Sequence, residues 1–389
     1  MIFVVVGGGI AGVSCSLEIL KHSMDAETQV ILISASSHVK TVKNWYKIGQ
    51  FTEHFDVGET NEPISNDNRL KIIFDTVTSF NPLEKCLSTG QSGEIRYDRL
   101  AIATGASPIC PYKSKNVICI RDTDTVIKLE EKLKNAKKLA IIGNGGIATE
   151  LVYELKNVNI VWLIRDSSIS SAFFPAQLAN FITSKLLKGR GENRKNSGIL
   201  KRQIFTTSSL GPSGAALGPD WCTAVDLTGA GDQGQHNVEI IQNAKVANIC
   251  ETQSGLRVDY TAREAQHQID CDFAVWATGV VPNSQIWAEH LEIAENHGII
   301  VDDLFRTTIP DVFACGDVCT LRFPDSSPLW KQMYLWTQAR QMGASCGLSM
   351  VIGEEARISN IHLDLFAHCT TFFGLKRLII NTEPTNYIN

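Results

Sequence analysis

A glycine-rich segment near the start of the chain has the spacing of a loop that holds phosphate groups. Gly7, Gly9 and Gly12 follow an apolar run, with Ile10 and Ala11 between the last two glycines. In such a loop the first glycine permits a tight turn, and the second leaves room for a pyrophosphate beside the backbone. The third lets a helix pack on the preceding strand, and the N-terminus of that helix attracts negative charge. The segment therefore predicts a dinucleotide site.

The same device recurs in the middle of the chain. Gly143 and Gly145 take the first two glycine positions, Gly146 and Ile147 follow, and Ala148 takes the third position. Alanine is permitted there because helix and strand can still approach closely. The sequence therefore predicts a second dinucleotide site.

Residues beyond each loop bear on which dinucleotide binds. An acidic residue is expected at the end of the second strand of such a unit, where it holds the ribose hydroxyls. The first unit has Ser34 there, which can make one hydrogen bond but no charge-assisted pair. The second unit has Arg165, which could bind a 2′-phosphate, followed by Asp166, which leaves NADH open. Glu150 is either a solvated carboxylate on a helix or a hydrogen-bond partner near the nicotinamide.

The elements that must position these loops are alternating strands and helices. Apolar runs predict buried strands, helical patterns follow both glycine loops, and this alternation is typical of an α/β fold with parallel sheets. A helical run is expected from residue 336 to about residue 350. The expected strands are residues 2–6, 29–33, 72–74, 100–103, 138–142, 159–164, 237–241, 272–277 and 378–380.

Composition narrows the class of protein. The 389 residues are 44% hydrophobic and carry a formal net charge of -5, which argues against a nucleic-acid footprint. We expect no secretory or mitochondrial signal, since an apolar strand begins at residue 2, and no apolar run long enough to span a membrane. Eleven cysteines without a framework spacing indicate reduced thiols in a cytosolic or nuclear setting. No metal site is predicted.

Three further motifs occur in a fixed order along the chain. Ala103-Thr104-Gly105 closes a strand in the first half, and Thr278-Gly279 closes one after the second glycine loop. Gly316-Asp317 follows the segment Val312-Phe313-Ala314-Cys315. This order resembles the pyridine nucleotide-disulfide oxidoreductase family, over residues 1 to about 350.

The resemblance implies a glutathione-reductase-like fold: two nested Rossmann-like domains that bind FAD and NAD(P)H. It implies that Gly316 and Asp317 bond the flavin ribityl chain, and that Trp336 and Thr337 open a helix that points at the flavin ring. The implied domains are a discontinuous FAD-binding domain (1–125 and 270–325), an NAD(P)-binding domain (126–269) with a flexible insertion at about 189–235, and a truncated C-terminal α+β segment (326–389).

The cysteine pair of an ordinary disulfide reductase is missing. Residues 36–58, where one subgroup of the family carries it, contain no cysteine, and the chain has no Cys-x-x-Cys. Cys315 and Cys319 are either buried small hydrophobes or a redox pair near the ribityl chain. Lys40 and Lys43 fall where related flavoproteins place a cation near flavin N5, although each could equally be a surface lysine. Disulfide reductase activity is not expected.

Further stretches resemble one branch of the family, among them Ile120-Arg121-Asp122-Thr123-Asp124 and Leu217-Gly218-Pro219-Asp220-Trp221. Members of that branch oxidise NAD(P)H slowly and associate with the tRNA ligase catalytic subunit, whose active site they protect from oxidation. The resemblance implies a nuclear and cytoplasmic location. Trp330, Tyr334 and Trp336 would suit a protein interface or core packing.

Two other functions remain open on the sequence alone. An ordinary reductase would pass electrons to oxygen, a quinone or an iron–sulfur protein, and it needs the same cofactor geometry. A non-enzymatic adaptor would keep the fold and lose the flavin, an alternative suggested by Ser34 and the short C-terminal segment.

Overall fold

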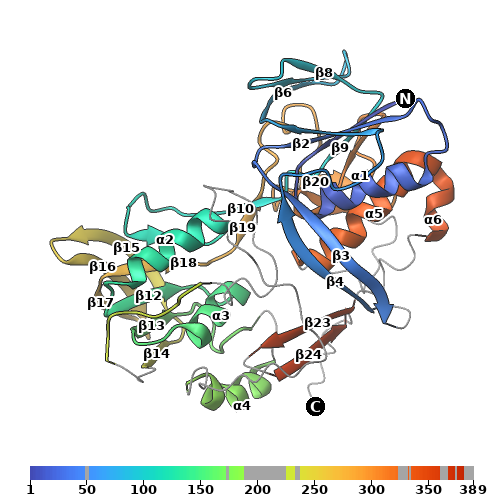
Figure 1. Ribbon diagram of the computed structural model, residues 1–389. Helices are drawn as coiled ribbons and strands as arrows, with labels where there is room; N and C mark the ends of the chain where they lie inside the picture. Colours follow the sequence, from blue (N-terminus) through green and yellow to red (C-terminus); the bar gives the residue numbers. More distant parts are fainter. Residues whose placement is uncertain are drawn as a thin grey trace.

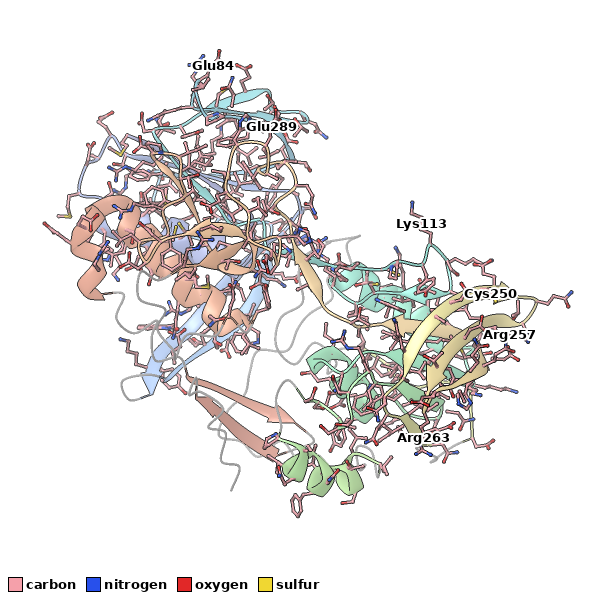
Figure 2. The ribbon with its side chains drawn as sticks, turned by 180° about the vertical axis from the view of Figure 1, so that it is seen from behind. Glu84, Lys113, Cys250, Arg257, Arg263 and Glu289 are labelled. Carbon is pink, nitrogen blue, oxygen red and sulfur yellow. The ribbon has the colours of Figure 1, made fainter. Side chains whose placement is uncertain are left out.

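The computed structural model has two lobes joined by a narrow ribbon (Figure 1). It describes residues 1–48, 52–171, 175–187, 225–232, 237–322, 332, 334–359, 367–372 and 375–380. Figure 2 shows the molecule from behind: Glu84 and Glu289 mark the outer end of the first lobe, and Lys113, Cys250, Arg257 and Arg263 lie on the second.

The first lobe is built on a five-stranded parallel sheet. Its middle strand β1 (Ile2–Val6) carries the first glycine loop at its carboxyl end, and helix α1 (Ile10–His22) follows that loop. Helix α5 (Trp336–Ile352) packs against α1 on the same face of the sheet (Figure 1). The strand order is β21 (Val312–Ala314), β9 (Arg99–Ile102), β1 (Ile2–Val6), β2 (Gln29–Ser34) and β5 (Leu70–Phe74).

Antiparallel pairs extend this lobe at segments where no strand was expected. The hairpin of β3 (Val39–Ile48) and β4 (Thr52–Thr60) projects from the lobe (Figure 1). A three-stranded antiparallel sheet joins β6 (Val77–Asn81), β7 (Cys86–Thr89) and β8 (Glu94–Arg96). Strand β20 (Ile299–Val301), in contrast, pairs in parallel with β22 (Cys319–Leu321).

The second lobe repeats the plan of the first. Its parallel sheet has β12 (Lys138–Ile142) in the middle, with the second glycine loop at the carboxyl end of that strand and helix α3 (Gly146–Glu154) after the loop. The strand order is β11 (Val117–Ile118), β18 (Phe273–Trp276), β12 (Lys138–Ile142), β13 (Asn159–Leu163) and β14 (Val238–Ile241). Helices α2 (Thr123–Leu133) and α4 (Ala176–Leu186) and an antiparallel sheet complete it: β15 (Lys245–Thr252), β16 (Gly255–Ala262) and β17 (Ala265–Cys271).

The chain crosses between the lobes on a two-stranded ribbon. Strand β10 (Ala106–Pro108) leaves the first lobe, and β19 (Val280–Pro282) returns antiparallel to it. Because β11 and β18 are strands of the second sheet, the expected boundaries at residues 125 and 270 need correction. Both crossings lie at the ribbon, about ten to twenty residues away from those boundaries.

The C-terminal part contains the short helix α6 (Ala356–Ser359) and the hairpin of β23 (Ala367–Phe372) and β24 (Leu375–Ile380). The expected strand at 378–380 lies within β24. Most of the expected insertion at 189–235, and Trp330, lie outside the described residues. No helix in the described ranges is long and apolar enough to cross a membrane.

Candidate functional site

A cavity of about 870 Å³ opens at the carboxyl end of the first sheet. Its size is in the range of cofactor and small-molecule sites, and it lies where open α/β sheets bind their ligands. Of the residues predicted from the sequence, eleven line it: Gly7, Gly9, Ile10, Ala11, Ser34, Lys40, Ala103, Thr104, Gly105, Asp317 and Trp336.

The first glycine loop has the geometry that its spacing predicts. A Cβ on Gly7 would lie 2.1 Å from the carbonyl oxygen of Ala103, and one on Gly12 would lie 1.9 Å from that of Gly7. Around Gly9, in contrast, a Cβ would meet nothing within 4 Å. Gly7 and Gly12 are therefore required by the fold itself, whereas the space beside Gly9 is free for a ligand.

Ser34 ends β2 at the rim of the cavity. Its hydroxyl donates to the carbonyl oxygen of Ser36 at 2.9 Å and so holds the loop that follows β2. The neighbouring Asp75, which the sequence did not single out, also lines the cavity. Burial raises the pKa of Asp75, but its carboxylate accepts backbone N–H bonds from Thr76, Gln91 and Ser92, which together outweigh burial and hold that pKa well below its usual range.

Of the two candidate lysines, only Lys40 lines the cavity in the described part of the chain. Its backbone N–H donates to the carbonyl oxygen of Gly8, and its ammonium group pairs with Glu59 at 2.5 Å. Burial lowers the pKa of Lys40, and the carboxylate of Glu59 partly offsets that effect. Lys43 is exposed, because residues three apart on a strand point to opposite faces.

The far wall of the cavity carries a carboxyl group and an aromatic ring. Burial raises the pKa of Asp317 to about 6. Gly316 before it has φ 75°, and a Cβ there would lie 2.7 Å from that of Ala11. Trp336 contacts Phe55 edge to face at 4.9 Å, whereas Thr337 is buried and does not line the cavity.

Asn283 joins the two crossings between the lobes, a role that the sequence did not reveal. Its side-chain amide donates to the carbonyl oxygen of Thr104 at 2.8 Å and accepts from the Ser107 hydroxyl at 2.7 Å. The Thr104 hydroxyl donates in turn to the carbonyl oxygen of Asn283 at 2.9 Å. In the sequence, only the position of Asn283 directly after Val280-Val281-Pro282 could have indicated this role.

The second glycine loop matches the first. A Cβ on Gly143 would lie 2.0 Å from the carbonyl oxygen of Ala277, and one on Gly145 would meet nothing within 4 Å. The buried indole of Trp162 donates to the carbonyl oxygen of Gly143 at 2.6 Å. Gly146 and Ile147 begin α3, so that its N-terminus faces the space beside Gly145.

The other predicted residues of this unit lie around the loop. Arg165 is exposed at the end of β13, where a ribose phosphate could reach it. Asp166 accepts a hydrogen bond from the Asn144 amide at 2.6 Å, and this bond lowers the pKa of Asp166. Glu150 is half-buried on α3, and Thr278 and Gly279 are exposed after β18.

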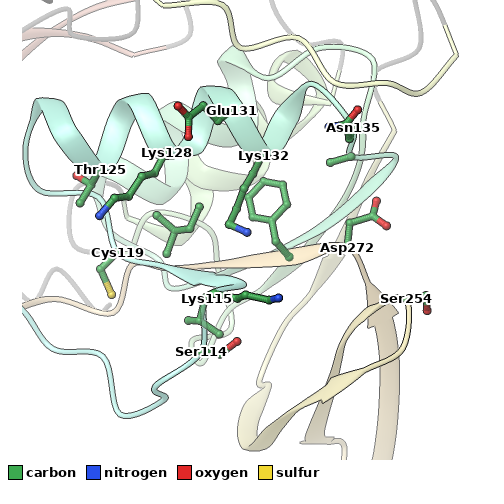
Figure 3. Close-up of a pocket in the computed structure, with 14 residues that line it drawn as sticks. Ser114, Lys115, Cys119, Thr125, Lys128, Glu131, Lys132, Asn135, Ser254 and Asp272 are labelled. Carbon is green, nitrogen blue, oxygen red and sulfur yellow. The ribbon is translucent and has the colours of Figure 1, made fainter. Parts of the chain in front are cut away.

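A separate cavity of about 770 Å³ lies beside α2 (Figure 3). It carries Lys115, Lys128 and Lys132 together with Glu131 and Asp272. Asp272 directly precedes β18, so this cavity lies at the amino end of that strand, the edge opposite to the glycine loop.

The two cysteines near the Gly-Asp pair are fully buried. Cys315 follows β21, and Cys319 begins β22, where its thiol contacts the carbonyl oxygen of Gly316 at 3.4 Å. Neither residue lines the cavity of the first lobe.

Comparison with known proteins agrees with this geometry. The model of the family described as pyridine nucleotide-disulphide oxidoreductase matches residues 1–191 and 232–343. The proteins named "Pyridine nucleotide-disulfide oxidoreductase domain-containing protein 1" from Drosophila melanogaster and Homo sapiens are 37% and 34% identical to the chain. Each alignment covers 97% of this chain and 82% of the relative.

Solved structures share the fold at lower sequence identity. A water-forming NADH oxidase from Lactobacillus brevis, bound to NADH, has a TM-score of 0.63 at 18% identity and covers 90% of this chain and 69% of its own. Putidaredoxin reductase in its covalent complex with putidaredoxin has a TM-score of 0.64 at 13% identity. The match covers 97% of this chain and 81% of the reductase chain. The expected α/β fold with nested dinucleotide-binding units is therefore confirmed.

Proposed function

The chain belongs to the pyridine nucleotide-disulphide oxidoreductase family, and from this premise we propose that it is an FAD-dependent NAD(P)H oxidoreductase that works without a redox-active disulfide. The observation that carries the proposal is the cavity of the first lobe. It joins the open space beside Gly9 to Lys40, Asp317 and Trp336 in one continuous pocket.

The residues of this cavity fit FAD. The N-terminus of α1 would hold the pyrophosphate beside Gly9, because backbone N–H groups there point at the ligand. Asp317, whose carboxyl is poorly solvated, would accept hydrogen bonds from the ribityl hydroxyls. When bound, FAD would supply the two-electron chemistry by accepting a hydride from the nicotinamide.

The protein's own contribution would be orientation and charge. Lys40 would place a positive charge close to the flavin, and its pairing with Glu59 keeps that side chain from turning away. The loop of Gly143 and Gly145 would hold NADH or NADPH in the second lobe. Asn283 would keep the two lobes in register, because the ring-to-ring distance must be about 3–3.5 Å for hydride transfer.

The absence of cysteine from residues 36–58 supports the second half of the proposal. Without a thiol pair beside the flavin, electrons have no relay to a disulfide substrate. We therefore propose a long-lived complex of reduced flavin and NAD(P), located in cytoplasm and nucleus. Its use would be to protect the tRNA ligase catalytic subunit from oxidative inactivation, as the resemblance to one branch of the family suggests.

A second candidate is a reductase that passes electrons to a small acceptor. It is favoured by a more distant relative, named as a ferredoxin–NAD(+) reductase component of a dioxygenase, which is 21% identical over 90% of this chain. The two candidates differ in how fast the reduced protein is reoxidised.

Anaerobic titration of the purified protein with NADPH and then NADH, followed by visible absorbance, tests these functions. Bleaching of the flavin bands, with a long-wavelength charge-transfer band that persists after opening to air, is the expected result. Rapid reoxidation would favour the reductase, and a protein without any flavin would leave only an adaptor. Protection is tested by exposing the tRNA ligase catalytic subunit to air with the protein and NAD(P)H, and with the Gly9→Ala variant as control.

A further inference from the structure

Three cysteines from distant parts of the sequence meet behind the cavity of the first lobe. Cys15 lies on α1, Cys315 follows β21, and Cys346 lies on α5. Their sulfur atoms all lie within 4.8 Å of one another, and each of the three residues is 0% exposed. A fourth sulfur completes the group, because the Cys15 thiol contacts the Met350 thioether at 3.9 Å. We call Cys15, Cys315, Cys346 and Met350 the sulfur cluster.

The close crossing of α1 and α5 holds this cluster together. A Cβ on Gly343 would lie 2.1 Å from the carbonyl oxygen of Ala11, and one on Gly347 would lie 2.5 Å from that of Cys15. Only glycine permits the two backbones to approach so closely. The sulfur atoms are therefore positioned by rigid backbone elements rather than by mobile loops.

The spacing suits a single metal ion. Three sulfur ligands at about 2.3 Å from one ion lie roughly 4 Å apart when they surround it as a triangle. The three cysteine sulfur atoms would therefore have to close by less than about 1 Å, a movement that side-chain rotation can supply.

The donor set favours one class of metal. All four donors are sulfur, and one of them is a thioether, which binds soft ions. A structural zinc ion prefers four thiolate, imidazole or carboxylate ligands, and a catalytic zinc ion keeps a water ligand. The residues of the cluster are fully buried, so that water cannot readily complete a zinc site. We propose that the sulfur cluster is a binding site for one copper(I) ion.

Burial determines how such a site would be loaded. Only one of the three thiols would lose its proton to solvent, so that one thiolate and the copper(I) ion together leave no net charge in the apolar core. The other sulfur atoms of the cluster would serve as neutral donors. Because the ligands are inaccessible in the folded protein, copper would enter during folding. This site would be independent of the proposed flavin chemistry.

The location gives the metal a structural consequence. Cys15 lies on the helix that starts at the first glycine loop, and Cys315 directly precedes the Gly316-Asp317 pair. A copper ion bound to Cys15, Cys315 and Cys346 would therefore link α1 and the Gly316-Asp317 segment to α5. Copper loading should therefore raise the thermal stability of the first lobe.

The test is to produce the full chain in cells supplied with copper, purify it anaerobically and measure metal by mass spectrometry. We expect about one copper ion per chain, retained against a copper(I) chelator until the protein is denatured. The variants Cys15→Ala and Cys346→Ala should contain at least about tenfold less copper per chain than the wild type. Cys271→Ala, at a buried cysteine of the second lobe, and Cys319→Ala are the matched controls and should retain it.

Three results would overturn the proposal: substoichiometric copper, equal copper in the control and cluster variants, or zinc bound in place of copper. If the cluster variants fail to fold, X-ray absorption spectroscopy of the copper-loaded wild type identifies the atoms that bind the copper ion. Scattering by sulfur neighbours alone supports the site, and nitrogen or oxygen neighbours overturn it. Refolding with and without copper(I) provides a second measurement, in which an unchanged melting temperature counts against the proposal.

Discussion

Lys40 and Glu59 form a buried ion pair at the edge of the cofactor cavity, directly opposite each other on β3 and β4. Their side chains are 2% and 8% exposed, and 2.5 Å separates the Lys40 Nζ from the Glu59 Oε1. An ion pair so poorly solvated holds its geometry firmly, since either partner alone would be left as an uncompensated buried charge. The pair therefore links the β3–β4 hairpin to the site.

Removing one partner of this pair should be costly. Lys40→Met leaves Glu59 buried without its cation, and we expect a loss of about 3–5 kcal/mol in the free energy of unfolding. Lys40→Met combined with Glu59→Leu should recover much of that loss, because both charges are then absent. Denaturant unfolding of the four proteins of this cycle measures the coupling, and additive losses would contradict a direct pair.

The same lysine should make stability depend on pH on the alkaline side. Burial lowers the pKa of Lys40 from its ordinary 10.5 in the folded protein. Between the lowered pKa and 10.5 the unfolded chain therefore binds more protons, and the contribution of Lys40 to stability rises with pH. The stability of the wild type relative to Lys40→Met should increase as pH rises toward 10.5. Chemical denaturation of both proteins at several pH values checks this prediction. A fall in the relative stability of the wild type as pH rises would contradict it.

Two glycines of the first loop should respond differently to alanine. Gly12→Ala places a methyl group 1.9 Å from the carbonyl oxygen of Gly7 and should prevent the first lobe from folding normally. Gly9→Ala meets no protein atom within 4 Å, so the protein should fold and lose its flavin, because the methyl group occupies the space of the pyrophosphate. Circular dichroism and the flavin-to-protein absorbance ratio separate the two effects. Gly145→Ala is the control and should keep its flavin.

Arg165 should set the preference between the two nicotinamide cofactors. Its exposed guanidinium at the end of β13 can pair with the 2′-phosphate that distinguishes NADPH from NADH. Arg165→Ala should raise the KM for NADPH by about tenfold and leave that for NADH nearly unchanged, as the loss of one such pair implies. Flavin reduction measured with both cofactors checks this, and equal changes would mean that Arg165 does not contact the phosphate.

Asn283 should matter for the alignment of the lobes rather than for cofactor content. Asn283→Ala removes the bonds to Thr104 and Ser107 that tie the β10 and β19 segments together. Flavin occupancy should stay near that of the wild type, while the rate of flavin reduction by saturating NAD(P)H falls roughly 10–100-fold, since about 1 Å of misplacement has that effect. Stopped-flow reduction measures the rate. Asn296→Ala is a suitable control, because the Asn296 side chain bonds to Gly298 and Thr320 and not to the ribbon strands.

Much of the fold was predictable because its central strands are buried on both faces. Such strands appear in the sequence as short apolar runs, and residues 2–6 and 138–142 match β1 and β12 to the residue. Glycine loops are equally local, since a tight turn and a helix start depend on a few neighbouring residues. The start of α5 at Trp336 also matches the expectation, which the family resemblance supplied.

The antiparallel hairpin of β3 and β4 was not predicted, because each of its polar strands is stabilised by its partner strand rather than by a local pattern of residues. The hairpin of β3 and β4 carries Lys and Glu inward only because the two residues neutralise each other. Which of Lys40 and Lys43 faces the cavity followed from the register of that hairpin, and register is a property of the folded pair.

The sequence by itself therefore determined the two glycine loops, the parallel sheets and the order of the motifs, because each is encoded by contiguous residues. Only the tertiary structure decided where the lobes are joined and which side chains meet. Asn283 reaches Thr104, and Cys15, Cys315 and Cys346 converge, because helices and strands far apart in the chain pack against one another. Such long-range packing cannot be predicted from a local pattern of residues.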